Sequence, residues 1–246
     1  MNANGFEKLH GIDEMDEKQV LTLCRTAEQL TRQKLSGTIE LYRPVKVQTG
    51  RTPRQTGARR IRRTNVMKRI GILGAGTWGM ALARMLTVSG NDVLVWSAIE
   101  KEIDSLSTTR KHPNLPQMKI PDELRFTKSI EEVCTGKDVL LFAVPSVFVR
   151  STAAKARPYV ADGQIIVDVA KGIEPDTLYT MTEILADELG KEGGPKGVRL
   201  VALSGPTHAE EVAIDLPTTI VSASKDMEAA AYVQEVFTNN VMRVYT

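Results

Sequence analysis

The sequence predicts an α/β protein in which a doubly wound, mainly parallel sheet follows a mostly disordered N-terminal extension. Two observations support this prediction. Short, continuously apolar runs alternate with helical stretches after residue 67, and a glycine-rich turn joins the first run to the first helix. Parallel strands that helices cover on both faces have this continuous apolar character. We therefore expect an extension over residues 1–66 and a globular domain over residues 67–246.

The composition is that of an ordinary globular protein, with 42% hydrophobic and 25% charged residues among 246. The net charge of +2 conceals an asymmetry. Residues 1–67 hold 13 Lys and Arg against 7 Asp and Glu, whereas residues 68–246 hold 19 against 23. The longest nearly unbroken apolar run, 139–149, is shorter than the roughly 20 residues that cross a bilayer. We therefore expect no membrane span.

The extension contains one region with a helical spacing of apolar residues, 14–33, followed by a basic segment. Residues 44–64 hold six arginines, no acidic residue and few apolar residues to offset the entropy lost on ordering. This segment is predicted to be a disordered linker. A basic arm can hold nucleic acid, but charge runs of this kind are usually solvated, so nucleic-acid binding is not expected.

Hydrophobic periodicity and helix-end signals predict the elements of the globular part. The predicted strands are 69–73, 93–96, 139–144, 165–169, 200–203, 218–222 and 241–245. The main helices predicted between them are 78–88, 147–156, 178–189, 207–213 and 226–237. Asp226 is the expected N-cap of the last helix, and Gly190 is expected to end the third. The alternation predicts a series of βαβ units.

The segment 74–79, Gly-Ala-Gly-Thr-Trp-Gly, joins the first strand directly to the first helix. In this context the spacing GxGxxG indicates a dinucleotide site. Gly74 allows a tight turn, Gly76 allows a pyrophosphate to approach the backbone, and Gly79 allows close packing of the helix on the sheet. The free N–H groups of the helix start then face the phosphates. A turn that binds nothing is the alternative, and the position in the first βα unit favours binding.

An acidic residue about 20 positions after such glycines usually holds the adenosine ribose of NAD. The second strand instead ends in Trp96-Ser97-Ala98, and Glu100 is expected to open the following helix. No arginine is present there to bind a 2′-phosphate. The sequence therefore leaves open whether the cofactor is NAD or NADP.

Four of the predicted parallel strands end in residues that could form a site, because parallel strands deliver their carboxyl ends to one edge of a sheet. These residues are Ser97, Pro145-Ser146, Lys171-Gly172 and the segment 204–208. Lys171 could meet a phosphate or a polarised carbonyl oxygen, although most lysines are simply solvated. Thr207 is also a good helix N-cap, and His208 is as consistent with a structural role as with a catalytic one.

Cys24 and Cys134 are the only cysteines, and no CxxC motif or His-rich cluster accompanies them. Neither a disulfide framework nor a metal site is expected. Acidic residues precede any apolar stretch at the N-terminus, which fits neither a secretory signal nor a transit peptide. We therefore expect a cytoplasmic protein.

The globular part also contains several motifs in a distinctive order. They are 71–79 (GILGAGTWG), 114–116 (NLP), 143–146 (AVPS), 171–174 (KGIE), 204–211 (SGPTHAEE) and 243–245 (RVY). In order and spacing these motifs resemble the cofactor domain of bacterial NAD(P)-dependent glycerol-3-phosphate dehydrogenase. The resemblance covers residues 67–246 and does not account for residues 1–66.

The resemblance implies a Rossmann-type fold and reversible hydride transfer between NAD(P)H and dihydroxyacetone phosphate, giving sn-glycerol 3-phosphate for phospholipid synthesis. The residues expected to contact the cofactor are Gly74, Gly76, Thr77, Trp78, Gly79, Ser97, Pro145, Phe148, Lys171 and Ala209. Lys171 is also the expected catalytic residue within this sequence, and it is expected to line the substrate with Gly205 and Thr207. The resemblance implies no metal and allows a homodimer.

Two features depart from the family pattern. Ala98 stands where the family often has a basic residue, which weakens any inference of NADP preference. The family also continues into a C-terminal helical domain, absent from this sequence, that supplies its main catalytic lysine and a phosphate-binding arginine. A C-terminally truncated chain that binds cofactor with poor turnover is therefore expected.

Two other functions remain open. One is a related Rossmann dehydrogenase acting on a hydroxy acid or sugar acid, although the segment Ser-Gly-Pro-Thr-His-Ala at 204–209 argues against it. The other is a non-catalytic dinucleotide-binding module, including a sensor that uses the arginine-rich segment as a basic arm.

Overall fold

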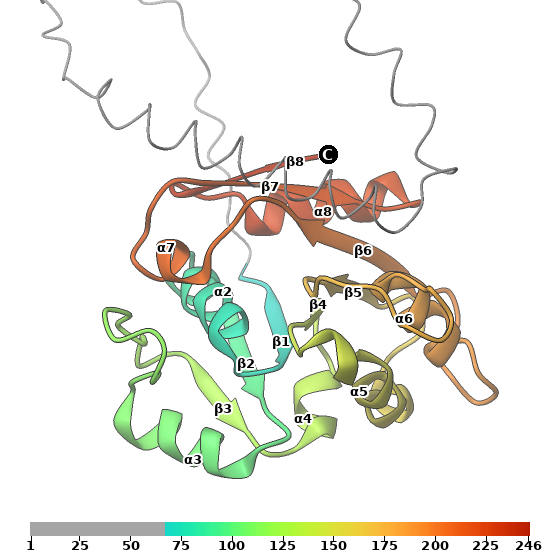
Figure 1. Cartoon of the computed structure of the whole chain (residues 1–246), viewed down its shortest axis with the longest axis horizontal. Helices are drawn as coiled ribbons and strands as arrows, with labels where there is room; N and C mark the ends of the chain where they lie inside the picture. Colours follow the sequence, from blue (N-terminus) through green and yellow to red (C-terminus); the bar gives the residue numbers. More distant parts are fainter. Residues whose placement is uncertain (1–66) are drawn as a thin grey trace, which may run out of the picture. The chain divides into compact units, whose positions relative to one another are not determined.

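Eight strands form one sheet in the order β3-β2-β1-β4-β5-β6-β7-β8 within residues 67–246, the part of the chain that the computed structural model describes (Figure 1). The helix predicted at 14–33 and the basic linker predicted at 44–64 lie outside the described residues. The strands are β1 (Arg69–Leu73), β2 (Asp92–Trp96), β3 (Arg125–Thr127), β4 (Val139–Phe142), β5 (Ile165–Asp168), β6 (Arg199–Ser204), β7 (Thr218–Ala223) and β8 (Met242–Tyr245).

The strand order reverses at β1, which pairs with β2 on one side and with β4 on the other. Ile70 lies opposite both Val93 and Val139, and both pairings are parallel. The pairing of β6 with β7 is antiparallel, whereas the remaining neighbouring pairs are parallel. The prediction of a doubly wound, mainly parallel sheet is therefore confirmed. Ligands bind such sheets at the carboxyl ends of the strands, where the order reverses.

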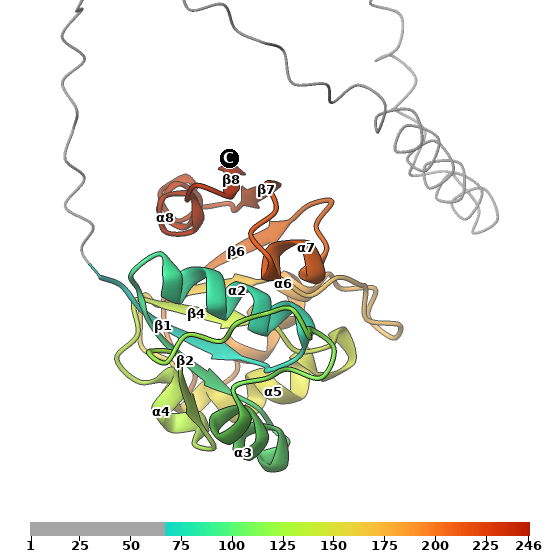
Figure 2. The same cartoon turned by 90° about the vertical axis from the view of Figure 1, so that its left-hand side faces the viewer.

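Helices cover both faces of the sheet, and Figure 2 shows α2 and α5 on opposite sides of it. The α-helices are α2 (Thr77–Val88), α3 (Glu100–Thr109), α4 (Ile130–Cys134), α5 (Val149–Ala156), α6 (Met181–Leu189), α7 (Ala209–Ala213) and α8 (Met227–Phe237). Short 3₁₀ turns, η3 (Ser146–Phe148) and η4 (Arg157–Tyr159), flank α5.

Burial on both faces explains the continuous apolar runs of the central strands. In β4, Val139 and Leu141 belong to the core cluster that includes α2 and α8, whereas Leu140 and Phe142 belong to the cluster that includes α5 and α6. All four side chains have no exposed surface. Successive residues of a strand point to opposite faces, so a strand between two helical layers needs apolar residues at every position.

Three predicted helices begin later than the sequence pattern indicates. Leu178 has a φ of +59°, which is incompatible with a helix, so α6 begins at Met181 and is capped by Thr180 and Glu183. The helix predicted from Val147 is preceded by η3, in which Phe148 N–H donates to the Pro145 carbonyl.

The predicted helix 207–213 also begins later, at Ala209. Thr207 N–H donates to the Gly205 carbonyl at 2.9 Å, which turns the chain before the helix starts. His208, and not Thr207, is therefore the N-cap of α7. Asp226 caps α8 as predicted, since its side chain accepts from Glu228 and Ala229 N–H groups.

Candidate functional site

Backbone contacts require glycine at two positions of the glycine loop, residues 74–79. Gly74 has a φ of +125°, and a Cβ there would lie 2.5 Å from the Ala143 carbonyl oxygen. Its N–H donates to the Trp96 carbonyl oxygen at 2.8 Å, which fixes the turn against β2. A Cβ at Gly79 would lie 2.2 Å from the Gly74 carbonyl oxygen. The first and third glycines therefore allow the tight turn and the close helix packing that the motif predicts.

Gly76 has different surroundings. It is the N-cap of α2 with φ −66° and ψ 177°, a conformation that any residue can adopt. A Cβ at Gly76 would meet no protein atom within 4 Å. No side chain caps the start of α2, so its first N–H groups are available to a ligand. The open space in front of a helix start is suited to a phosphate group.

A cleft of about 530 Å³ lies beside this helix start, at the carboxyl edge of the sheet. Four segments that are far apart in the sequence line it: the glycine loop, the residues after β4, those after β5, and the start of α7. The lining residues are Gly76, Thr77, Trp78, Ala143, Val144, Pro145, Ser146, Val169, Ala170, Lys171, Thr207, His208 and Ala209.

The cleft brings together most of the predicted site residues, from Gly76 through Pro145 and Lys171 to Ala209. Ser97 and Phe148 are not among its lining residues, and Phe148 is 56% exposed on η3. Gly205 does not line the cleft but contacts Lys171. Apolar residues just after β4 and β5 also line the cleft, Ala143-Val144 and Val169-Ala170. They were not predicted as site residues because apolar residues after a strand carry no polar signal.

Lys171 lies just beyond β5 and is exposed at the cleft. Its Nζ donates to the Gly205 carbonyl oxygen at 3.2 Å. The next residue, Gly172, has a φ of +144°, and a Cβ there would lie 3.1 Å from the Ser146 Cβ. Close packing against the β4 loop therefore fixes the backbone beside this lysine.

The Lys171 loop, residues 171–180, is held by an ion pair with α5. Arg150 donates from Nε and Nη2 to the two carboxylate oxygens of Glu174, both at 2.7 Å. Thr177 Oγ1 adds a hydrogen bond to the same carboxylate at 2.6 Å. Arg150, followed by Thr177, lowers the pKa of Glu174 to about 2. This carboxylate is charged at neutral pH and joins the loop to the helix that follows the β4 loop.

A buried carboxyl group lies at the end of β5, three residues before Lys171. Asp168 is 5% exposed, and its Oδ1 accepts from Ala170 N–H at 3.1 Å. Burial raises the pKa of Asp168 to about 7, against the smaller opposing effect of that hydrogen bond. The Lys171 loop therefore begins beside a group that titrates near neutral pH.

The carboxyl end of β2 holds an acidic side chain that the sequence did not reveal. Ser97 Oγ donates to Glu102 Oε2 at 2.6 Å, and Ile99 N–H donates to Ser97 Oγ at 3.2 Å. Glu102 is five positions beyond Ser97, in the first turns of α3, and the turn into that helix brings it back to the strand. The signal that would have identified Glu102 is its position in the first turn of the helix that follows the strand end.

Within residues 67–246, no three His, Cys, Asp or Glu side chains come together as metal ligands would. Over the same described residues, no helix combines the length and apolar character needed to cross a membrane. Cys134 is buried there, and burial raises the pKa of its thiol to about 12.

The reversed strand order and the glycine loop at the switch point define a Rossmann-type domain of the class that binds dinucleotides. The family model described as "NAD-dependent glycerol-3-phosphate dehydrogenase N-terminus" matches residues 69–230. The chain therefore belongs to the NAD-dependent glycerol-3-phosphate dehydrogenase family.

Curated relatives support this assignment. A protein of Lactobacillus delbrueckii subsp. bulgaricus named glycerol-3-phosphate dehydrogenase [NAD(P)+] 2 is 66% identical over 180 residues, which are 73% of this chain and 53% of that protein. A protein of Agathobacter rectalis named glycerol-3-phosphate dehydrogenase [NAD(P)+] is 46% identical over 181 residues, 73% of this chain and 52% of that protein. The chain spans about half the length of these relatives.

Solved structures show the same fold. The crystal structure of glycerol-3-phosphate dehydrogenase from Coxiella burnetii superposes with a TM-score of 0.64 at 30% identity, over 73% of this chain and 53% of that chain. A UDP-glucose dehydrogenase from Pyrobaculum islandicum superposes with a TM-score of 0.59 at 20% identity, over 80% of this chain and 48% of that chain. The latter likeness concerns the fold alone.

Proposed function

We propose that the cleft binds NAD(H) or NADP(H), with the pyrophosphate at the start of α2 and the nicotinamide toward Lys171. The observation that carries this proposal is the convergence of the glycine loop and Lys171 on one cleft. A Cβ at Gly76 would meet no protein atom within 4 Å. The space in front of this residue is therefore free for a phosphate group. The names of the relatives also specify NAD(P)+.

Residues of this chain would hold the dinucleotide in three places. Thr77 and Trp78, in the first turn of α2, would offer N–H groups and contact surface to the phosphates. Pro145 and Phe148, after β4, would contact the cofactor from the neighbouring strand. Ala209, at the start of α7, would contact it from a third segment that lines the cleft.

We further propose that the substrate pair is dihydroxyacetone phosphate and sn-glycerol 3-phosphate. The bound cofactor would supply or accept the hydride. Lys171 would place its ammonium against the C2 oxygen or the phosphate of the substrate, and either contact stabilises negative charge. Gly205 and Thr207 would line the substrate beside it, since the Gly205 carbonyl already contacts Lys171 at 3.2 Å.

Titration with NADH tests cofactor binding directly. Gly76→Val is expected to fold with nearly unchanged thermal stability, because its backbone angles suit any residue and the new Cβ meets no protein atom. The same substitution is expected to weaken NADH binding at least tenfold, since the side chain would occupy the phosphate space. Calorimetry showing parental affinity for the Gly76→Val protein would overturn this placement of the cofactor.

Oxidation of NADH with dihydroxyacetone phosphate tests turnover separately. Lys171→Gln is expected to lower the rate about 10²-fold or more if this lysine acts on the reacting oxygen. The rate itself is expected to be low, because this chain spans about half the length of its curated relatives. Binding of NADH with no detectable turnover of any substrate would favour a non-catalytic dinucleotide-binding module. Turnover of a hydroxy acid in place of the phosphate ester would favour a related Rossmann dehydrogenase.

We also propose a cytoplasmic location and a homodimer as the working form. The two widely spaced cysteines support the first proposal, and the second follows from the resemblance to the family. Fractionation of cells tests the location, and light scattering of the purified chain tests the oligomeric state. A secreted product or a monomer at micromolar concentration would contradict them.

A further inference from the structure

An acidic side chain occupies the carboxyl end of β2, and α3 supplies it instead of the strand. Ser97 is 7% exposed, so its hydroxyl is fixed in place and orients the Glu102 carboxylate through the 2.6 Å hydrogen bond. That bond uses one oxygen of the carboxylate. A carboxylate has about four acceptor positions, so Glu102 retains acceptor capacity for a further donor.

The same carboxylate lies near His112, a residue that contacts the glycine loop. Its negative charge acts on His112, a 3% exposed residue whose imidazole interacts with the Ala75 backbone. The Asn114 N–H donates to His112 Nδ1 at 3.2 Å, which holds the ring in place. Ala75 is the second residue of the glycine loop. Glu102 is therefore bonded to the end of β2 and lies near the residue that borders the loop where the pyrophosphate would bind.

We infer that Glu102 accepts hydrogen bonds from the adenosine ribose hydroxyls and makes this chain prefer NAD(H) over NADP(H). The inference rests on the proposed function, because it places a dinucleotide across the same switch point. In Rossmann-type domains the ribose lies at the end of the second strand, and an acid there selects the free 2′-hydroxyl. A 2′-phosphate would instead bring negative charge against Glu102, which costs free energy in a partly buried position.

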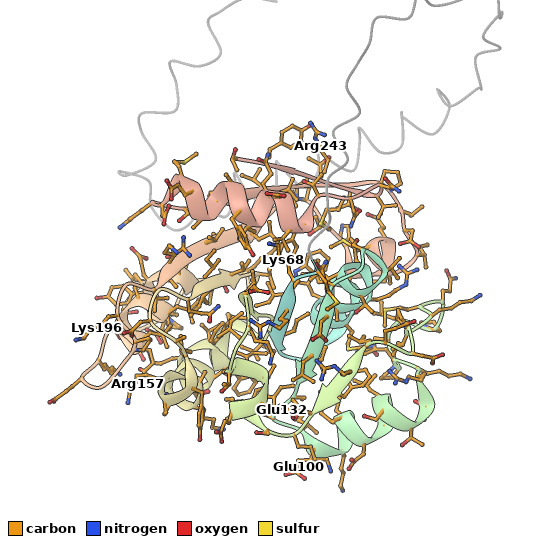
Figure 3. The ribbon with its side chains drawn as sticks, turned by 180° about the vertical axis from the view of Figure 1, so that it is seen from behind. Lys68, Glu100, Glu132, Arg157, Lys196 and Arg243 are labelled. Carbon is orange, nitrogen blue, oxygen red and sulfur yellow. The ribbon has the colours of Figure 1, made fainter. Side chains whose placement is uncertain are left out.

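The other charged groups around this strand end do not compensate for that repulsion. Residues 97–102 contain one lysine and no arginine. Lys128 is paired with two carboxylates of α3, with Glu100 at 3.6 Å and Asp104 at 2.8 Å. Glu100 points away from the ribbon (Figure 3), with 73% of its side chain exposed, so it adds negative potential without reaching the strand end.

Separate titrations with NADH and NADPH test the inference in the full chain. The parent is expected to bind NADH at least about tenfold more tightly than NADPH. Glu102→Gln keeps the size of the side chain and an acceptor for Ser97, but removes the charge. We expect Glu102→Gln to reduce the ratio of the NADPH to the NADH dissociation constant about tenfold, mainly by tighter NADPH binding. In the parent protein, we expect this ratio to decrease as salt is added.

Asp104→Asn is the matched control, because Asp104 lies on the same helix but pairs with Lys128, and 61% of its side chain is exposed. It is expected to leave the NADH to NADPH ratio within twofold of the parent, since its charge is screened by solvent. Ala98→Arg tests the converse: a cation at the exposed residue after Ser97 is expected to tighten NADPH binding.

The results separate this inference from the proposed function. If both cofactors bind, but the parent shows no preference or Glu102→Gln leaves the ratio unchanged, the role of Glu102 is overturned and the cleft assignment stands. If neither cofactor binds the parent, the proposed function fails and the inference fails with it.

Discussion

Two loops contribute to the lining of the cleft and are built by different means. The glycine loop takes its shape from backbone contacts: Gly74 lies against Ala143, and Gly79 lies against Gly74. The Lys171 loop takes its shape largely from charged side chains, with Arg150 and Glu174 joined at 2.7 Å. Substitutions in the glycine loop are therefore expected to act through added side-chain volume. Substitutions in the Lys171 loop are expected to act through lost charge and to depend on pH.

The largest expected effect is in the glycine loop. Gly79→Ala places a Cβ 2.2 Å from the Gly74 carbonyl oxygen, and neither backbone can move without separating α2 from β1. We expect a loss of roughly 3 kcal/mol or more in the free energy of unfolding, at the upper end for overpacked sites. Denaturant unfolding measures it. If Gly79→Ala were as stable as Gly76→Ala, the close contact of the helix would not require glycine at position 79, and this prediction would be wrong.

A smaller effect is expected at the start of the Lys171 loop, and it depends on pH. Asp168 has a pKa of about 7 in the folded protein, above its ordinary value of 3.8, because it is buried. Between these values the unfolded chain has released the proton that the folded chain keeps. The folded state therefore loses stability as the pH rises from about 4 to 7, by an amount on the order of 3–4 kcal/mol.

Asp168→Asn isolates this pH dependence, since asparagine keeps an acceptor for Ala170 N–H and never ionises. We expect the variant and the parent to have similar stability near pH 4 and the variant to be more stable above pH 7. Asp176→Asn, at an exposed residue of the same loop, is the control, with an expected change below about 0.5 kcal/mol. A constant difference between Asp168→Asn and the parent from pH 4 to 8 would show that Asp168 is ionised throughout.

The smallest expected effect concerns the ion pair that holds the Lys171 loop. Arg150→Met keeps an apolar stem but releases Glu174, so we expect faster hydrogen exchange over 171–180 and NADH binding weakened about threefold to tenfold. Because Arg150 lowers the pKa of Glu174 to about 2, the pair is lost only as the pH falls from about 4.5 toward 2. Its contribution is therefore constant above about pH 4.5, over most of the range where Asp168 titrates.

Arg125→Met is the matched control for this prediction. Arg125 pairs with Asp92 at 2.6 Å, and both residues lie at the amino ends of their strands, away from the cleft. We expect unchanged NADH affinity in that variant. Equal weakening of NADH binding by Arg125→Met and Arg150→Met would show that the effect is general destabilisation.

The comparison also explains which features the sequence could predict. The glycine loop is contiguous, and backbone contacts require glycine at Gly74 and Gly79, whereas Gly76 leaves open space, so its spacing alone indicated the turn. Seven of the eight strands were equally predictable, because burial leaves their apolar runs visible. The edge strand β3 was not predicted, since its three residues, Arg-Phe-Thr, form no apolar run. The start of α6 was not, since the left-handed Leu178 follows from hydrogen bonds across its own loop, with Leu178 N–H donating to the Glu174 carbonyl.

Side chains that act through tertiary contacts were also missed. Glu102 reaches Ser97 only because α3 folds back on the end of β2, and the local sequence there reads as a strand end without an acid. Arg150 lies in α5 and Glu174 lies 24 positions further on in the Lys171 loop, so only the fold joins them. The positions of strand ends are thus readable from hydrophobic pattern, whereas the charged partners around them depend on how each loop turns.

Hydrogen exchange with and without NADH tests the central claim, that both loops line one dinucleotide site. Residues 74–79 and 171–180 both contribute to the lining of the cleft, so one bound molecule should slow exchange in both at the same NADH concentration. The account predicts coincident protection of these two segments in the parent and its loss in Gly76→Val. Protection of neither segment, or of one without the other at saturating NADH, would contradict it.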